Sequence, residues 1–449
     1  MDNSTCPLDY RYGRKELREI FGETKRLQFL LDVESSLARA HAKVGNIPKN
    51  AANEITKKAS IKYVKVNRVN EIESETKHDI MAVTIALSEV CDDDAGKYIH
   101  LGATSYDIVD TANALQFSES TTYIQKGLKE LRTTLLNLSK KYKKTVMLGR
   151  THGQHTIPIT FGLKMAGYAM EIERHLERLF ECKSRLLIGK LSGAVGTGAA
   201  LGEKALEIQE EMLKELRLGT EDVSTQIVCR DRYNELLCIL ANISTSIEKF
   251  ATEIRNLQRD EIAEVAEAFE AKKQVGSSTM PHKRNPITSE QICGLSRIVR
   301  SFIIPAFENS IQWHERDLCN SSSERFIIPH SIILTDWIVY QTNSVFKNLK
   351  IFPERMRKNM DISKGLPMAE SMMTTLIKKG MGRGNAHELM RKTSLKAIRL
   401  DKSLKEIFIE ENKKFKLLNN NEIDYALNPD NYLGVTEKII DRVIKKLDR

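Results

Sequence analysis

Hydrophobic positions recur with a period of about 3.5 residues within residues 220–275, a stretch that contains neither glycine nor proline. The apolar side chains of this seam are spaced alternately by four and three residues: Leu236, Leu240, Ile243, Ile247, Phe250, Ile254 and Leu257. Such a seam lets one helix pack along another over several turns. A helix over 232–271 is about 60 Å long at 1.5 Å per residue. We therefore predict a long helical bundle that is shared between subunits.

Helical patterns also occupy residues 14–44, 111–142, 161–187 and 331–346, whereas strand-like alternation is scarce. The helical pattern breaks at residues 98–105, and again at 351–366 before shorter helices fill the rest of the chain. This predicts an all-α fold with a central bundle of long helices flanked by two smaller helical domains. The expected boundaries are 1–105 for the N-terminal domain, 106–358 for the bundle and 359–449 for the C-terminal domain.

Composition excludes several classes of protein. The chain has 449 residues, of which 41% are hydrophobic and 29% charged, with only 10 Pro and 23 Gly. These values exclude disordered and collagen-like chains. The longest apolar run, residues 236–241, is far shorter than the roughly 18–20 residues that cross a bilayer. We predict no membrane segment and, because no targeting segment is visible, a cytoplasmic location.

Charge and cysteine usage restrict the partners further. Lys and Arg exceed Asp and Glu by 69 to 60, a net charge of +9 spread along the chain. No zinc-finger, helix-turn-helix or RNA-recognition pattern accompanies it, so we expect an anionic small-molecule substrate rather than a nucleic acid. The seven cysteines form no C-x-x-C pair, which predicts reduced, mostly structural thiols.

The most unusual segment follows the predicted long helix: residues 276–286 read G-S-S-T-M-P-H-K-R-N-P. Two prolines and a glycine exclude a continued helix, and loops on rigid scaffolds often carry binding groups. As an arbitrary loop it would be a solvated connection. Its residue order, however, resembles the signature of the fumarase/aspartase superfamily, whose members cleave C–N or C–O bonds by β-elimination. Within it the segment resembles the adenylosuccinate lyases, although carboxymuconate cycloisomerases carry a very similar loop.

Other segments carry the same resemblance. Residues 149–158 read G-R-T-H-G-Q-H-T-I-P, in which the H-x-x-H pair lacks a third ligand and is a weak metal signal. Residues 75–79 and 100–107 alone would be ordinary helix starts, but they resemble substrate-contacting regions of these lyases. The segments 9–13 and 313–325, the latter with W-H-E-R-D and S-S-S-E-R, distinguish adenylosuccinate lyases from their relatives.

The resemblance implies specific roles. His152 is the general acid, consistent with the near-neutral pKa of imidazole, although it could instead cap the following helix. Ser277 is the base, which requires nearby cations because a serine hydroxyl is a very weak base. The implied substrate-binding residues are Arg11, Tyr12, Lys77, His78, Asp79, Thr104, Ser105, Gln226, Ser278, Lys283, Asn285, Arg316, Ser321 and Arg325, with Glu290 and Gln291 in supporting positions.

Two positions depart from the pattern of many relatives. Lys77 stands in place of an arginine, so a two-pronged contact becomes a point-charge contact. Gln291 replaces an expected asparagine, which lengthens the side chain at that position. In the segment 193–198, the order G-x-x-G-x-G is reversed from the dinucleotide fingerprint and implies neither NAD nor ATP. We expect its small residues to permit close backbone packing or an ordered loop beside the site.

The implied reaction is the β-elimination of fumarate from adenylosuccinate to give AMP, and from the succinylated aminoimidazole-carboxamide ribotide (SAICAR) to give AICAR. Proton removal next to a carboxylate creates an enediolate-like anion, for which Lys283 and Asn285 are the expected stabilising groups. The resemblance implies no metal and no cofactor, and a homotetramer in which three subunits form each site. The alternatives are a carboxymuconate cycloisomerase, an argininosuccinate lyase, a catalytically silent scaffold, or a nucleic-acid-binding helical protein.

Overall fold

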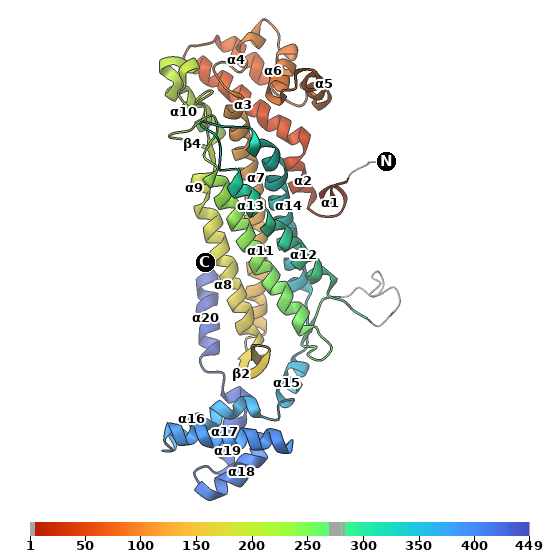
Figure 1. Ribbon diagram of the computed structural model, residues 1–449, viewed down its shortest axis with the longest axis vertical. Helices are drawn as coiled ribbons and strands as arrows, with labels where there is room; N and C mark the ends of the chain where they lie inside the picture. Colours follow the sequence, from red (N-terminus) through yellow and green to blue (C-terminus); the bar gives the residue numbers. More distant parts are fainter. Residues whose placement is uncertain (1–4, 269–279, 281–282, 449) are drawn as a thin grey trace. The chain divides into compact units, whose positions relative to one another are not determined.

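The computed structural model describes residues 5–268, 280 and 283–448. Helices dominate these residues (Figure 1), and the strands among them form only three two-stranded pairs. The prediction of an all-α fold is confirmed. No helix in the described part of the chain is long and apolar enough to cross a membrane.

The chain forms two compact units, each built from separate segments. Unit 1 comprises Met1–Leu128, His175–Glu248 and Ile292–Gln341. Unit 2 comprises Lys129–Arg174, Lys249–Gln291 and Thr342–Arg449. Five long helices contribute residues to both units: α7 (Ser105–Lys141), α8 (Phe161–Glu181), α11 (Asp231–Leu257), α12 (Ile287–Ser301) and α14 (Cys319–Asn348). The three-domain division at residues 105 and 358 stays a prediction.

Unit 1 contains the N-terminal helices and elements from its two later segments, 175–248 and 292–341. Its elements are α1 (Pro7–Tyr10), α2 (Lys15–Phe21), α3 (Glu23–Lys43), α4 (Lys49–Lys58), α5 (Val66–Thr76), α6 (Asp79–Val90), η1 (Ala95–Tyr98), α9 (Lys183–Leu186), β3 (Ile188–Gly189), η2 (Ala199–Lys204), α10 (Ala205–Leu216), β4 (Gly219–Thr220) and α13 (Ile303–Glu308). Helix α3 packs against α4 and α10, and α5 packs against α6, as both ribbon views show.

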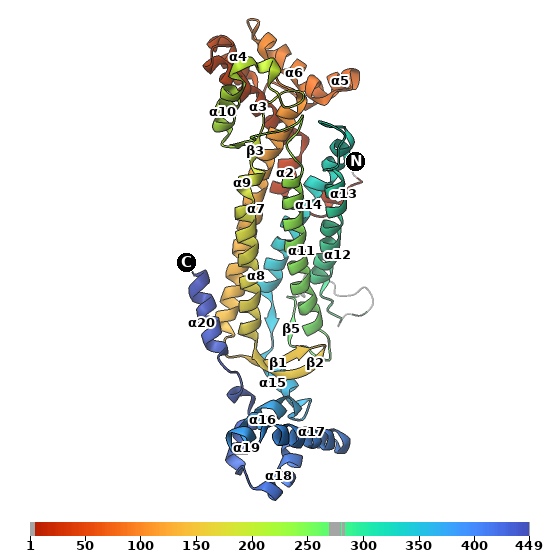
Figure 2. The ribbon, with the colours of Figure 1, turned by 60° about the vertical axis from the view of Figure 1, so that its left-hand side comes forward.

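Unit 2 combines a hairpin with the C-terminal helices. Its elements are β1 (Val146–Thr151), β2 (Gln154–Thr160), β5 (Val265–Ala266), β6 (Lys350–Ile351), α15 (Pro353–Asp361), η3 (Leu366–Met368), α16 (Ala369–Lys378), α17 (Arg383–Leu400), α18 (Leu404–Phe415), α19 (Asn420–Leu427), η4 (Pro429–Asn431) and α20 (Thr436–Leu447). The β1–β2 hairpin lies against α15 (Figure 2). Within unit 2, Tyr168 of α8 stacks on Phe250 of α11 with ring centroids 4.1 Å apart.

The predicted helices are found with shifted ends. The pattern over 14–44 is divided at Gly22 into α2 and α3, and that over 161–187 into α8 and α9. The pattern over 331–346 lies inside the longer α14, and that over 111–142 corresponds to α7. The residues at which a helix begins and ends depend on capping groups and tertiary contacts, which a periodic pattern of apolar residues does not reveal.

The heptad seam is buried as predicted, since none of its seven side chains is more than 2% exposed. The predicted helix over 232–271 is wrong for residues 258–268, because α11 ends at Leu257 after about 40 Å; residues 269–271 lie outside the described residues. The next two seam positions are Glu261 and Glu264 rather than apolar residues. The backbone turns at Ala263, which has a φ of 51°, and the amide of Glu264 donates to the carbonyl of Leu257 at 2.9 Å. Helix α11 therefore ends at Leu257 although residues 220–275 contain neither glycine nor proline.

A matched pair of leucine truncations tests the importance of the seam. Leu240 is 0% exposed on α11, and Leu206 is 71% exposed on α10. We expect Leu240→Ala to lower the free energy of unfolding by about 2–5 kcal/mol because it leaves a cavity, and Leu206→Ala to change it by less than about 0.5 kcal/mol. Chemical denaturation measures both. Equal effects of the two variants would contradict the burial of the seam.

Candidate active site

The start of α6 brings two of the predicted site residues together. His78 caps this helix because its Nδ1 atom accepts a hydrogen bond from the amide of Met81 at 3.2 Å. A backbone amide only donates, so the proton of a neutral His78 resides on Nε2. That atom lies 3.4 Å from the hydroxyl of Ser105, the first residue of α7. A helix does start at this segment, but its cap is His78 rather than an aspartate, and the cap orients the imidazole toward Ser105.

Asp79 lies next to His78 and binds Arg325 of α14. The guanidinium donates to the Asp79 carboxylate at 2.7 Å. Lys77 ends α5 in a left-handed conformation with a φ of 55°, and its side chain is exposed. The contact between Asp79 and Arg325 joins two segments that are far apart in the sequence.

A second group of contacts surrounds Arg316. Its Nη1 atom donates to the side-chain oxygen of Gln226 at 2.8 Å, and its guanidinium lies 3.5 Å from the ring centroid of Tyr106. Tyr106 is buried, which raises the pKa of its phenol, and it shares a hydrogen bond with Ser321. The Nε and Nη2 atoms of Arg316 are buried without a hydrogen-bond partner among the described residues. Unsatisfied buried donors are costly, so this guanidinium is suited to an anionic ligand.

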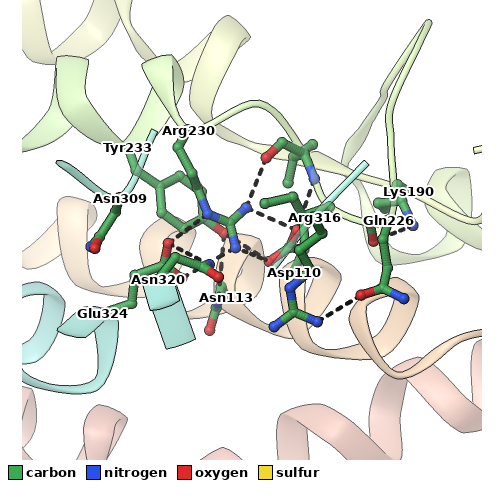
Figure 3. A network of polar contacts seen from close by, with 12 residues as sticks. Asp110, Asn113, Lys190, Gln226, Arg230, Tyr233, Asn309, Arg316, Asn320 and Glu324 are labelled. Carbon is green, nitrogen blue, oxygen red and sulfur yellow. Dashed lines mark hydrogen bonds and ion pairs between the residues drawn. The ribbon is translucent and has the colours of Figure 1, made fainter. Parts of the chain in front are cut away.

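A fully buried charge network underlies these residues (Figure 3). Arg230 forms two hydrogen bonds of 2.9 Å to Asp110 and bonds of 2.6 and 3.1 Å to Glu324. It also donates to the carbonyl of Val228 at 2.8 Å. Burial alone lowers the pKa of Arg230, but the adjacent carboxylates outweigh it and hold that pKa well above its usual value. The network connects α7, α14 and the segment before α11.

A second buried pair lies beneath Thr104 and Gln226. Lys190 and Asp107 are both 0% exposed and form an ion pair. Asp107 accepts hydrogen bonds from the amides of Thr104 at 2.8 Å, Ser192 at 3.0 Å and Gly193 at 3.1 Å. The ammonium of Lys190 also donates to the carbonyl of Gln226 at 3.0 Å. One ion pair therefore fixes the backbone at two predicted substrate-binding positions.

The glycine-rich segment 193–198 packs closely, as expected. Gly196 has a φ of 89°, and a Cβ atom there would lie 2.0 Å from the carbonyl oxygen of Ser224. Only glycine fits that approach without a shift of the backbone. The amide of Gly193 binds Asp107, so the segment is an ordered loop next to the residues described above.

In unit 2, the hairpin of β1 and β2 carries His152 in its turn. His152 and Gly153 have φ values of 53° and 75°, the left-handed pair of a two-residue hairpin turn. His152 is exposed. The alternative role of His152 as a helix cap is excluded, because a strand rather than a helix follows the turn.

The hairpin is anchored by a buried carboxylate. Arg150 forms hydrogen bonds of 2.7 and 3.0 Å to Glu264. Glu264 is 0% exposed and also accepts a hydrogen bond from the side-chain Nδ2 of Asn359 at 2.9 Å. His155 lies 2.6 Å from the hydroxyl of Ser363. Burial, followed by the charge of Arg150, lowers the pKa of His155. These contacts hold the strands from which His152 projects.

The described part of the signature segment lines a pocket of 860 Å³ in unit 2. Lys283, Asn285 and Glu290 lie on its wall, together with residues from the end of α11 and the turn that follows. The side chain of Gln258 donates to the carbonyl of Arg284 at 3.0 Å and thereby ties the segment to that turn. Ser277 and Ser278 lie outside the described residues. Gln291 follows Glu290 on α12 but does not line this pocket.

The predicted site residues fall into the two units. Unit 1 contains Arg11, Tyr12, Lys77, His78, Asp79, Thr104, Ser105, Gln226, Arg316, Ser321 and Arg325. Unit 2 contains His152, Lys283, Asn285, Glu290 and Gln291. Arg11 and Tyr12 contact each other at 3.2 Å in an exposed position. The described residues include no group of three or more His, Cys, Asp or Glu that could hold a metal ion.

Sequence reasoning assigned no role to Asp107, Asp110, Lys190 or Arg230. Asp107 lies within a segment that was singled out, and Arg230 lies near Gln226. Their burial was the missing information, because charged residues on helices are usually exposed. A buried charge is recognisable only once its partner from another segment is known.

The fold and the segments described above define a class of enzyme. Residues 9–300 match a family model described as "Lyase". The crystal structure of a fumarate lyase from Mesorhizobium sp. BNC1 is similar, with a TM-score of 0.90 and 32% identity over 96% of this chain and 98% of the other. The 3-carboxy-cis,cis-muconate lactonizing enzyme from Pseudomonas putida has a TM-score of 0.90, 30% identity, and 98% and 99% coverage. The protein is a lyase with the predicted fumarase/aspartase-like fold.

The more specific comparisons identify the family. Residues 365–443 match a model described as "Adenylosuccinate lyase C-terminus". The adenylosuccinate lyases of Pyrococcus abyssi and Pyrococcus horikoshii are 50% and 51% identical over 442 residues, covering 98% of each chain. That of Methanocaldococcus jannaschii is 48% identical, over 98% of this chain and 96% of its own. The chain belongs to the adenylosuccinate lyase family, which confirms the resemblance found in the sequence.

The buried network predicts a large loss of stability when its central cation is removed. Arg230→Gln leaves Asp110 and Glu324 buried without compensation, so we expect a loss of about 3–5 kcal/mol in the free energy of unfolding. Arg391→Gln is the matched control, because Arg391 forms an exposed pair with Glu388 one helical turn away. Its denaturation midpoint should stay close to that of the parent protein. A midpoint of Arg230→Gln equal to the control would refute the energetic importance of the network.

Proposed function

We propose that this enzyme eliminates fumarate from adenylosuccinate to give AMP, and from SAICAR to give AICAR. The observation that carries the proposal is the identity of 50% with an adenylosuccinate lyase over 98% of both chains. The contacts that place Gln226, Arg316, Tyr106 and Ser321 around one another support it. They supply cationic and neutral donors of the kind that bind a phosphomonoester or carboxylate.

The proposed chemistry separates into two proton transfers. Ser277 takes the proton from the carbon next to a carboxylate of the succinyl group, and the electron pair forms the enediolate-like anion. Collapse of this anion forms the double bond of fumarate and breaks the C–N bond. His152 then donates a proton to the departing nitrogen of AMP. Atoms and charges balance without a redox step, and no cofactor or metal takes part in this scheme.

Stabilisation of the extra charge is the main requirement of the reaction, and groups that bind the anion better than the substrate raise the rate. Lys283 and Asn285 line one pocket in unit 2 and are suited to this role. The positive charge of Lys283 would also favour the deprotonated form of Ser277, which a neutral environment would not. The base assignment itself rests on the family resemblance.

The proposed homotetramer rests on exposed apolar side chains as well as on the resemblance. A segment of unit 1 presents several of them, 47–78% exposed: Ile298, Ile304, Phe307, Ile311, Trp313, Leu318 and Phe326. Clusters of this kind are typical of surfaces that other chains cover. Light scattering coupled to size exclusion tests this proposal, since it distinguishes a tetramer from a monomer. The cytoplasmic location stays a prediction.

The proposed activity is testable with purified protein. We expect adenylosuccinate to be converted to AMP and fumarate without added metal or cofactor, followed by the change in absorbance and by identification of both products. Argininosuccinate and 3-carboxy-cis,cis-muconate serve as comparison substrates for the two alternative enzyme classes. Turnover of one of these, and not of adenylosuccinate, would reject the proposal in favour of that class. No turnover of any substrate by a folded oligomer would favour the silent scaffold.

The two proton-transfer roles predict matched losses of turnover. We expect His152→Gln and Ser277→Ala each to lower kcat by at least about 100-fold, the lower end of the usual contribution of general acid or base catalysis. His387→Gln, an exposed histidine on α17, is the control and should retain parental kcat. Near-parental turnover of either site variant, with folding and oligomer size intact, would remove that residue from the mechanism.

A further inference from the structure

A cysteine and a histidine that are 324 residues apart in the sequence meet in unit 1. The Sγ atom of Cys6 lies 3.4 Å from the Nε2 atom of His330, which belongs to α14. Both side chains are half-buried. Cys6 directly precedes α1, and Arg11 and Tyr12 directly follow it. The contact therefore joins the start of a predicted substrate-binding segment to α14.

The other ring nitrogen of His330 decides the direction of this contact. Nδ1 lies 2.7 Å from the carbonyl oxygen of Phe326, one turn earlier on α14. A carbonyl oxygen only accepts, so the proton of a neutral His330 resides on Nδ1. Nε2 then presents its lone pair to the sulfur, and the thiol of Cys6 is the donor. The imidazole is therefore oriented as a base toward Cys6.

The ring of His330 also contacts two aromatic side chains. Its centroid lies 6.1 Å from that of Phe302 and 6.0 Å from that of Phe326. A nucleophile in contact with a base, with a third group that orients the base, is the usual arrangement of an activated nucleophile. Cys6, His330 and the carbonyl group of Phe326 have this arrangement.

The nearby charges leave the imidazole as the group that decides the protonation of the sulfur. Helix α1 contains one acidic residue, Asp9. The guanidinium of Arg18 donates to the carbonyl of Asp9 at 2.6 Å, so a cation lies over the same turn as this carboxylate. The imidazole is in direct contact with the sulfur. It becomes a cation when it takes the proton, and an adjacent imidazolium stabilises a thiolate.

The other six thiols have surroundings that disfavour the thiolate. Cys182 and Cys293 are only 1% and 2% exposed. Cys319 is exposed, but its hydrogen bond with Asp317, together with the charge of that carboxylate, raises the pKa of the thiol. Burial raises the pKa of the remaining three thiols: Cys91, Cys229 and Cys238. Exposure alone would make Cys229 and Cys319 the most reactive cysteines.

We propose that Cys6 is a nucleophilic thiol, activated by His330, and a site of covalent modification by soft carbon electrophiles. This inference goes beyond the proposed function and does not depend on it. In the modification, the thiol proton passes to Nε2 of His330 and the sulfur attacks the electrophilic carbon. With iodoacetamide, the S–C bond forms as the C–I bond breaks, and iodide leaves with the bonding electron pair. The step needs no oxidant or reductant.

Timed labelling of the native protein with iodoacetamide, followed by digestion and mass spectrometry, measures the rate at each cysteine. We expect Cys6 to be alkylated at least about 10-fold faster than Cys319, because an unactivated cysteine is only a few per cent thiolate at pH 7. Phe326 belongs to the exposed apolar side chains of unit 1, so the intact oligomer is labelled, in which Cys6 must stay accessible. Equal rates, or a faster reaction of the more exposed Cys319, would overturn the proposal.

His330→Gln tests whether the imidazole causes the reactivity. Glutamine can accept a hydrogen bond from the thiol but does not take its proton, so labelling of Cys6 should slow by about 10-fold, with the rate at Cys319 unchanged. His387→Gln, an exposed histidine on α17, is the matched control and should keep both rates at the parental value. A parental rate at Cys6 in His330→Gln would refute the activation. If His330→Gln does not fold, the comparison of Cys6 with Cys319 in the parent protein still decides the proposal.

Discussion

The buried contact of Arg230 with Asp110 and Glu324 is the constraint on which unit 1 depends. Each of these charges would be prohibitively costly alone in the interior, so the three must be brought together whenever the unit folds. Asp110 belongs to α7, Glu324 to α14, and Arg230 to the segment before α11. The same elements carry Ser105, Ser321 and Gln226. The network therefore sets the relative positions of predicted binding residues that it does not itself include.

The same arrangement recurs beneath the other parts of the candidate site. Asp107 and Lys190 fix the backbone at Thr104 and Gln226, and Glu264 anchors the hairpin that carries His152 through Arg150. In each case a fully buried carboxylate receives several donors. Rigid support of this kind limits the motion of the residues above it, which is what positioning for catalysis requires. The exposed residues interact with solvent or ligand, and the buried ones determine where they lie.

Much of the fold and the identity of the chemistry could be predicted from residues that stand close together in the sequence. The seam from Leu236 to Leu257 predicted a buried helix, and the segment 276–286 predicted the enzyme family. The end of α11 was missed although the seam stops in the sequence, where Glu261 and Glu264 take the next two apolar positions. What the sequence could not reveal is the burial of Glu264, because its partner Arg150 comes from a hairpin over one hundred residues away. The turn position of His152 was missed for a related reason: the short strands around it are stabilised by pairing with each other and by packing on α15.

The sequence by itself determined the helical class, the apolar seam, the family and the residue types available for acid–base chemistry, since these depend on local order and periodicity. The tertiary structure alone decided which charges are buried and which of them are compensated. Arg230 shows the difference. In the sequence it is one of many basic residues, and only the folded chain places it between the buried carboxylates of Asp110 and Glu324. Electrostatic free energy depends on distance and on burial, and neither is encoded in the spacing of residues along the chain.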